Sequence, residues 1–238
     1  MIDQTIIDLY KVFGRYPVNR GMEGSPLYGA KVKEWNAELL SKPLSQLNSE
    51  VLARFCSSVT LTWGSIDDYK HFLPRIYELI NRIDFIAEIW VVFDVLNKYD
   101  WYNWPNEEVS LLNRYFVDLW ESVICNSNEA TDYAVANYLS SISNVYLDFN
   151  ELLAMWQSNE SMPSVRKLAY YLSDNYEEIF IKVRLPGFHP SKERGEKLLE
   201  WLISPEMKTL LRKHRITYEG EDFEISLGWM VDTIDVYQ

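Results

Sequence analysis

Apolar residues recur every three or four positions in the run Ser65-Ile-Asp-Asp-Tyr-Lys-His-Phe-Leu-Pro-Arg-Ile-Tyr-Glu-Leu-Ile-Asn-Arg-Ile83, which gives the clearest indication of the fold class. That period is typical of an amphipathic α-helix. Ser65 supplies an N-cap hydroxyl and acidic residues follow it, which favours a helix start here. Pro74 interrupts the pattern, so we expect the helix to kink or split there. The charged side chains, Lys70 among them, lie mostly off the apolar stripe.

The same period continues through most of the chain, and helix-start signals recur along it. Prolines and small polar residues stand at these starts, as helix initiation favours. The sequence carries no hairpin signal such as Asn-Gly, and alternation is weak. The last twenty residues are ambiguous between a short alternating run and a helix. We predict helices over 49–62, 65–82, 85–98, 105–125, 129–142, 148–157, 164–181, 191–203 and 205–214.

Helices of this length joined by short loops pack on their sequence neighbours, so the predicted fold class is all-α, built from antiparallel helix pairs. From residue 49 onward the pattern resembles an α-solenoid of the HEAT or armadillo type. Because no self-similar period is found, an irregular helical bundle stays open. No hinge divides the chain, and we predict a single helical domain over 1–238 with one long irregular segment at 14–31. Such a loop is often functional or disordered.

The chain is acidic, with a formal net charge of −12. A duplex nucleic-acid binder needs a basic surface, so nucleic acid is not the expected partner and a basic protein is. The charge is uneven: 84–160 holds thirteen Asp or Glu against two Lys or Arg, a net −11, whereas 182–216 holds nine basic residues against four Glu, a net +5. Residues after 216 include six acidic and no basic side chains. Solvated helix faces or a polarised docking surface explain this pattern.

The sequence also bears on the compartment. Its first residues lack a basic region followed by an apolar run, and the longest wholly apolar run, Ile89–Phe93, is far below the roughly 20 residues that span a bilayer. We expect a cytoplasmic protein that does not enter a membrane. Cys56 and Cys125 lie in apolar helical patterns without a CxxC pair, so buried reduced thiols are expected.

Recognisable catalytic motifs are missing from the sequence. The run Gly24–Lys31 departs from the phosphate-binding Walker A pattern, because its lysine is displaced by one residue and no Ser or Thr follows. No GxSxG nucleophile motif occurs, and the three histidines lack ligand spacing. We therefore expect a non-enzymatic protein without a cofactor or a metal site.

Aromatic residues crowd the connection Tyr99-Asp-Trp-Tyr-Asn-Trp104 between two predicted helices. Such rings either plug the end of a bundle or anchor a protein interface, where Trp and Tyr contribute much of the binding energy. Acidic neighbours suit a basic partner. The candidate protein-binding residues are Tyr99, Trp101, Tyr102, Trp104, Glu107 and Glu108.

The run Leu61-Thr-Trp-Gly-Ser-Ile-Asp-Asp-Tyr-Lys-His-Phe-Leu-Pro-Arg75 resembles a family of uncharacterised bacterial proteins with a Thr-Trp-Gly-x-x-x-Asp-(Phe/Tyr)-(Arg/Lys)-His-Phe-Leu-Pro-Arg segment. Arg15-Tyr-Pro17, Glu23-Gly-Ser-Pro26 and Lys42-Pro-Leu44 are similar to the same family. The resemblance implies no activity. Family members commonly carry closely spaced cysteines after the Glu-Gly element, where this chain has Ser25-Pro-Leu-Tyr28, so no metal site is implied here.

Asp67 and His71 stand one helical turn apart, and Arg75 continues the same face. These side chains are explained by a solvated face with i,i+4 pairing, or by a structural corner in which His71 and Arg75 tie down the loop that carries Glu23. A third explanation makes Glu23, Asp67, His71 and Arg75 candidate ligand-binding residues. The protein would then be an enzyme or ligand-binding protein with its site between loop 14–31 and helix 65–82.

The leading hypothesis is a non-enzymatic bacterial protein that binds another protein. One concrete form is an immunity or antidote protein that neutralises a basic toxin, because an acidic surface speeds the capture of a basic partner.

Overall fold

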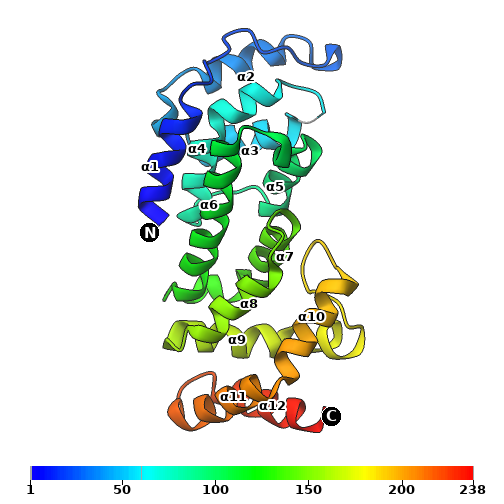
Figure 1. Ribbon diagram of the computed structural model, residues 1–238. Helices are drawn as coiled ribbons and strands as arrows, with labels where there is room; N and C mark the ends of the chain where they lie inside the picture. Colours follow the sequence, from blue (N-terminus) through cyan, green and yellow to red (C-terminus); the bar gives the residue numbers. More distant parts are fainter. Residues whose placement is uncertain (1, 60, 238) are drawn as a thin grey trace. The chain divides into compact units, whose positions relative to one another are not determined.

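The structure is a computed structural model that describes residues 2–59 and 61–237, without the side chain of Ala130. Every long element in this part of the chain is a helix, which confirms the predicted all-α class (Figure 1). The chain forms two compact units, unit 1 (1–119) and unit 2 (120–238), and each is described by itself. The single-domain organisation stays a prediction.

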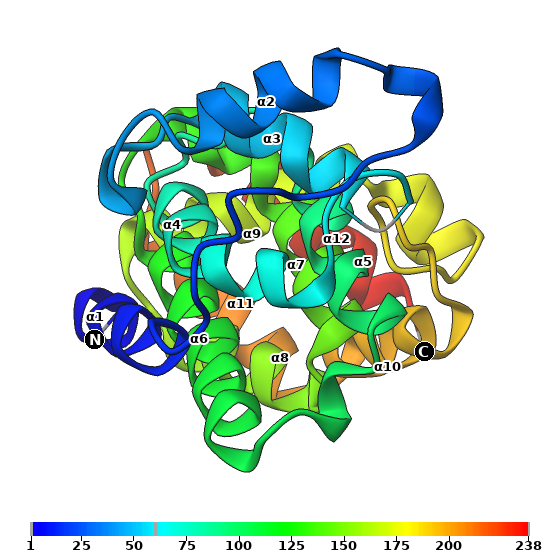
Figure 2. The ribbon, with the colours of Figure 1, turned by 90° about the horizontal axis from the view of Figure 1, so that it is seen from above.

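Unit 1 is built around helix α4 (Ile66–Asn81), which contacts α1, α3 and a short turn. Helices α1 and α2 were not expected from the sequence. Segment 14–31 leaves the end of α1 and crosses to α2 in Figure 2. The other elements of unit 1 are α1 (Ile2–Phe13), α2 (Lys31–Leu39), α3 (Ser49–Ser58), α5 (Ile89–Lys98), the first part of α6 (Asn106–Cys125) and 3₁₀ turns at Pro26–Tyr28, Leu44–Gln46 and Trp101–Asn103.

Helix α4 follows the predicted apolar stripe. The Ser65 hydroxyl accepts from the Asp68 amide and the Asp68 carboxylate accepts from the Ser65 amide, a reciprocal capping box that stabilises the first turn. The helix continues through Pro74 to Asn81, so the chain does not split at the proline. Two charged side chains depart from the pattern: Asp68 and Lys70 are buried.

Several predicted helices end or begin elsewhere. The segment 129–142 is a 3₁₀ helix over Glu129–Ala134 and becomes α-helical over Val135–Val145. The segment 49–62 is helical only to Ser58, and residue 60 lies outside the described residues. The segment 85–98 becomes helical only at Ile89, and residues 84–88 form an irregular connection before it. The segment 164–181 is α-helical to Asp174 and then forms a π-helical turn over Glu177–Ile181.

Unit 2 packs α9 (Met162–Asp174) against α12 (Glu224–Val236), three helices further along the chain, as well as against α7. The ambiguous C-terminal stretch is helical over Glu224–Val236. In unit 1, α1 packs likewise on α4. Such contacts between distant helices fit the irregular-bundle alternative within each unit, and a helical repeat stays a prediction. The other elements are the 3₁₀ helix η4 (Glu129–Ala134), α7 (Val135–Val145), α8 (Phe149–Ser158), α10 (Lys192–Ile203) and α11 (Pro205–Thr217).

The basic segment and the acidic tail of unit 2 pair with each other. Arg212 lies 2.7 Å from Asp235, and Arg215 lies 2.9 Å from Asp232. These exposed pairs add little stability, but they neutralise charge along α11 and α12. The solvated-face explanation therefore accounts for this part of the charge pattern.

No helix among the described residues is both long and apolar enough to cross a bilayer. Cys56 is buried, as expected. Cys125 is exposed, so the prediction of a buried thiol is wrong for it. It is the last residue of α6, where its side chain accepts a hydrogen bond from Asn159 at 2.9 Å.

Candidate functional site

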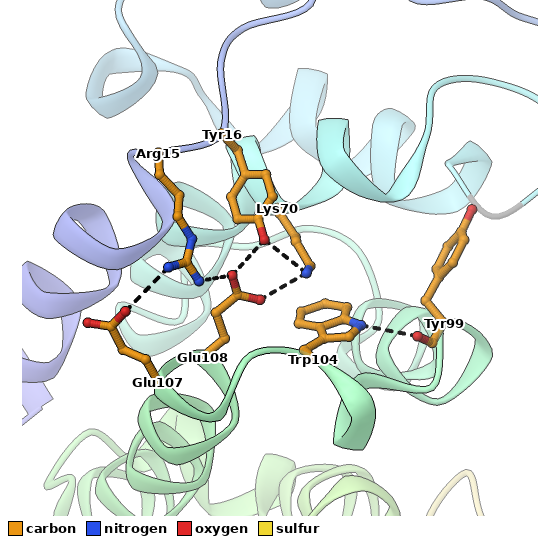
Figure 3. A network of polar contacts seen from close by, with 7 residues as sticks. All are labelled: Arg15, Tyr16, Lys70, Tyr99, Trp104, Glu107 and Glu108. Atoms are coloured by element: carbon orange, nitrogen blue, oxygen red, sulfur yellow. Dashed lines mark hydrogen bonds and ion pairs between the residues drawn. The ribbon is translucent and has the colours of Figure 1, made fainter.

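The most polar part of the interior of unit 1 is a cluster of four side chains beside the ring of Trp104 (Figure 3). The Glu108 carboxylate, with no exposed surface, accepts from Lys70 at 2.8 Å, from the Tyr16 hydroxyl at 2.6 Å and from Arg15. The Lys70 ammonium also lies 3.1 Å from the Tyr16 hydroxyl and 3.9 Å from the centre of the Trp104 ring. We call these five residues the Lys70–Glu108 clamp. It joins the start of segment 14–31 to α4 and α6.

Burial acts against the charge of Glu108 and raises its pKa, but the hydrogen bonds from Lys70, Tyr16 and Arg15 outweigh burial and hold the pKa below its ordinary value. Both carboxylate oxygens are occupied. An ionised carboxylate with its acceptor positions filled is a poor general base. The clamp therefore holds three segments together.

Some of the predicted protein-binding residues at 99–108 are buried, and others remain at the surface. Trp101 is buried and packs against other core rings, and Glu108 belongs to the clamp, so neither presents a surface to a partner. Tyr99 donates to the Val59 carbonyl at 3.2 Å. Tyr102, 38% exposed, and Glu107 remain at the surface, and their role in an interface stays a prediction.

Trp63 and Gly64 form a tight corner before α4. Glu23 and Gly24 pair with it: the Gly64 amide donates to the Glu23 carbonyl at 2.9 Å, and Gly24 and Trp63 form an isolated antiparallel bridge. Gly64 has φ +80°, a conformation that favours glycine. The Trp63 indole donates to Asn36 at 2.8 Å. These contacts fix the loop 22–25 against 62–64.

The four candidate ligand-binding residues are not brought together. Glu23 and Asp67 are exposed. His71 Nδ1 lies 2.9 Å from the Tyr16 carbonyl, so His71 ties down the start of segment 14–31. Arg75 instead donates to the Leu47 carbonyl at 2.9 Å and to Glu78 at 2.8 Å. The corner thus uses His71 as expected, whereas Arg75 anchors a different loop.

A cavity of about 410 Å³ lies between segment 14–31 and α4. His71 is the one of the four candidate residues that lines it. Two cationic side chains, Arg20 and Lys42, also line it, and most of the remaining lining residues are apolar. Its volume falls within the range of small-molecule sites.

The connection between α4 and α5 carries a strained residue. Ile83 has φ +57° and ends α4 where glycine is usual: its amide donates to the Ile80 carbonyl, and the Asp84 amide donates to the Leu79 carbonyl, both at 3.0 Å. A β-branched residue rarely adopts this conformation. The Ile83 side chain is 41% exposed and that of Ile86 is 68% exposed.

Arg15, Tyr16 and Lys70 were not among the residues predicted to form a site. Arg15 and Tyr16 precede a proline in an irregular segment, and Lys70 occupies a helix position that normally faces solvent. The one signal in the sequence was that all three residues lie in the segments that resemble the bacterial family with the Thr-Trp-Gly segment. The partner of Lys70 lies 38 residues further along the chain, so only the packing of α4 on α6 brings the pair together.

Comparisons of the chain with models of protein families, with curated proteins and with solved structures found no match. Membership of the family with the Thr-Trp-Gly segment therefore stays a prediction. Among the described residues, no group of three or more His, Cys, Asp or Glu side chains is placed to hold a metal ion.

Proposed function

We propose that this protein binds a basic protein partner through the α4–α5 loop, residues 82–88. The observation that carries the proposal is the strained and half-exposed Ile83. Strain of this kind costs of order 1–3 kcal/mol and concentrates at functional sites.

Within the part of the chain that the structure describes, the two other non-glycine residues with positive φ have local explanations. Asp100 has φ +49°, a conformation that Asp tolerates because its short polar side chain bonds locally. Val183 has φ +50°, and its carbonyl packs directly against Gly195 of α10. Ile83 ends α4 and is 41% exposed, and Ile86 three residues later is 68% exposed.

The charge of the loop suits a basic partner. Asp84 lies between the two isoleucines and Glu88 follows them, and both are exposed. Arg82 at the start of the loop pairs with Glu78, so the loop combines apolar side chains with a net negative charge. The Ile86 amide donates to the Ser49 hydroxyl at 2.7 Å, which anchors the loop to the start of α3. A loop already ordered in the free protein loses less entropy on binding. An immunity or antidote protein for a basic toxin is one form of this function.

Photo-crosslinking in the native host tests the proposal. A photoreactive residue replaces Ile86 in one protein and Leu147 in another; Leu147 is 78% exposed in unit 2 and serves as the matched control. Mass spectrometry identifies the crosslinked protein, which is then purified. We expect a basic protein captured at position 86 and absent at position 147.

Binding of the purified partner is then measured with two variants by surface plasmon resonance, which gives both the affinity and the association rate. Ile86→Ser should weaken binding at least tenfold, because it removes an apolar anchor. Asp84→Lys with Glu88→Lys should slow association, since the encounter with a basic protein is electrostatically steered. Equal crosslinking at both positions, or binding that these variants leave unchanged, would contradict the proposal.

A further inference from the structure

The cavity between segment 14–31 and α4 combines positive charge with an apolar wall. Arg20 enters from segment 14–31, Lys42 from the connection after α2, and His71 from α4. No acidic side chain is among the residues that line it. The apolar wall consists of Val18, Leu39, Leu40, Pro43, Leu44, Leu47 and Phe72.

The two cationic side chains have no protein partner of opposite charge. Among the described residues, neither Arg20 nor Lys42 forms an ion pair or side-chain hydrogen bond, although the chain as a whole carries a net charge of −12. Some other exposed cations of unit 1 are paired, Arg15 with Glu107 and Arg54 with Glu38, whereas Lys31 and Lys33 on α2 form no side-chain contact among the described residues. Two unpaired cations at one cavity therefore make a local positive region on an acidic protein.

His71 adds a third polar group. A carbonyl oxygen only accepts hydrogen bonds, so the contact between His71 Nδ1 and the Tyr16 carbonyl places a proton on Nδ1. That bond fixes the ring orientation and leaves Nε2 for another partner. The Phe72 ring packs edge-on against His71 at 4.8 Å between centroids, which further restricts the imidazole.

We propose that this cavity binds a small organic anion with one carboxylate or phosphate head and a short apolar tail. The head would pair with Arg20 and Lys42, because guanidinium and ammonium groups form strong charge-assisted hydrogen bonds with both head groups. The tail would lie on the leucine-rich wall, where burial of apolar surface stabilises it. This site is separate from the α4–α5 loop, so either proposal can fail without the other.

Titration calorimetry and ¹⁵N NMR with three probes of equal chain length test the site. Hexanoate and hexyl phosphate carry the two head groups, and 1-hexanol is the uncharged control. We expect saturable binding of at least one anion, with amide shifts at residues 39–44, and much weaker binding of hexanol. The stronger anion identifies the head group. Equal binding of hexanol, or no binding of either anion at millimolar concentrations, would overturn the proposal.

Charge-removing variants locate the site. Arg20→Gln and Lys42→Gln should each weaken binding of the anion about tenfold, since each removes one charge-assisted contact. Both side chains are exposed and unpaired, so the variants should fold normally. Lys31→Gln, an exposed lysine of α2 outside the cavity lining, removes the same charge and should leave affinity unchanged. If all three variants weaken binding equally, the anion responds to net charge alone and the assigned site is wrong.

Discussion

The Lys70 ammonium lies 2.8 Å from the Glu108 carboxylate, and both side chains are withdrawn from solvent. A buried ion pair adds little net stability over apolar residues of the same shape, but removal of one partner leaves a buried charge uncompensated. The main structural effect of the pair is therefore to fix which segments pack against each other. Here these are α4, the start of α6 and, through Tyr16, the first turn of the irregular segment.

Replacement of Lys70 should destabilise unit 1. Lys70→Met keeps most of the stem but leaves Glu108 with only Arg15 and Tyr16, so we expect a loss of about 3 kcal/mol in the free energy of unfolding. Urea unfolding followed by circular dichroism measures it. Lys11→Met, which breaks an exposed pair with Asp8, is the control and should cost less than about 0.5 kcal/mol. Equal losses for the two variants would show that burial of the pair is unimportant.

Stability should depend on pH through Glu108. Its pKa is lower in the folded protein than in the unfolded chain, so its contribution is present above the unfolded value of about 4.3 and is lost as pH falls through the folded value. Glu108→Gln lacks this carboxylate. We expect the difference in unfolding free energy between the two proteins to be largest above about pH 5 and to shrink at lower pH. A difference that stays constant down to about pH 3 would contradict the assignment.

Loss of His71 or Arg75 should lower the melting temperature. His71→Ala frees the Tyr16 carbonyl, and Arg75→Ala frees the Leu47 carbonyl and Glu78, so each should cost about 1–2 kcal/mol. Differential scanning calorimetry gives the comparison. Arg82→Ala removes only an exposed contact with Glu78 and should change stability by about 0.5 kcal/mol or less. Melting temperatures equal to that of the unchanged protein would exclude the corner's stabilising role.

Unit 2 contains a second buried charge cluster. Asp132 lies 2.9 Å from Lys167, which has no exposed surface, and 2.8 Å from Arg166. Asp132→Asn leaves both cations without their buried counter-charge, and we expect a loss of about 3–5 kcal/mol. Glu129→Gln removes an exposed carboxylate 3.9 Å from Arg166 and should cost less than about 0.5 kcal/mol. Urea unfolding of both variants measures their free energies of unfolding. Similar losses for the two variants would contradict the prediction.

Two glycines of unit 2 should respond oppositely to alanine. A Cβ atom at Gly195 would lie 2.5 Å from the Val183 carbonyl oxygen and 2.5 Å from the Arg184 Cα, so Gly195→Ala should cost about 1–3 kcal/mol or more. Gly228 lies inside α12, where the nearest atom is 3.6 Å away. Gly228→Ala should therefore stabilise the protein by up to about 1 kcal/mol. Thermal unfolding gives both values, and a stable Gly195→Ala protein would contradict the close approach.

Several features were predictable from the sequence alone. The apolar period and the cap at Ser65 predicted α4, because both depend on residues within a few positions of each other. The same local signals predicted α6 and most helices of unit 2. They missed α1 and α2, which the sequence analysis did not identify. They also placed the start of α5 too early, since the residues before Ile89 carry no signal that delays the helix start.

Composition and the apolar period were enough to predict a chain that is helical, acidic overall and irregular at 14–31. Which polar side chains are buried depended on the packing of segments far apart in the sequence. Lys70 occupies a helix position that local periodicity assigns to solvent, yet the packing of α6 and Trp104 encloses it. In the same way, Trp101 became core while Ile83 and Ile86 stayed exposed. Periodicity reports the direction of a side chain from its own helix, whereas burial depends on what distant segments place on that side.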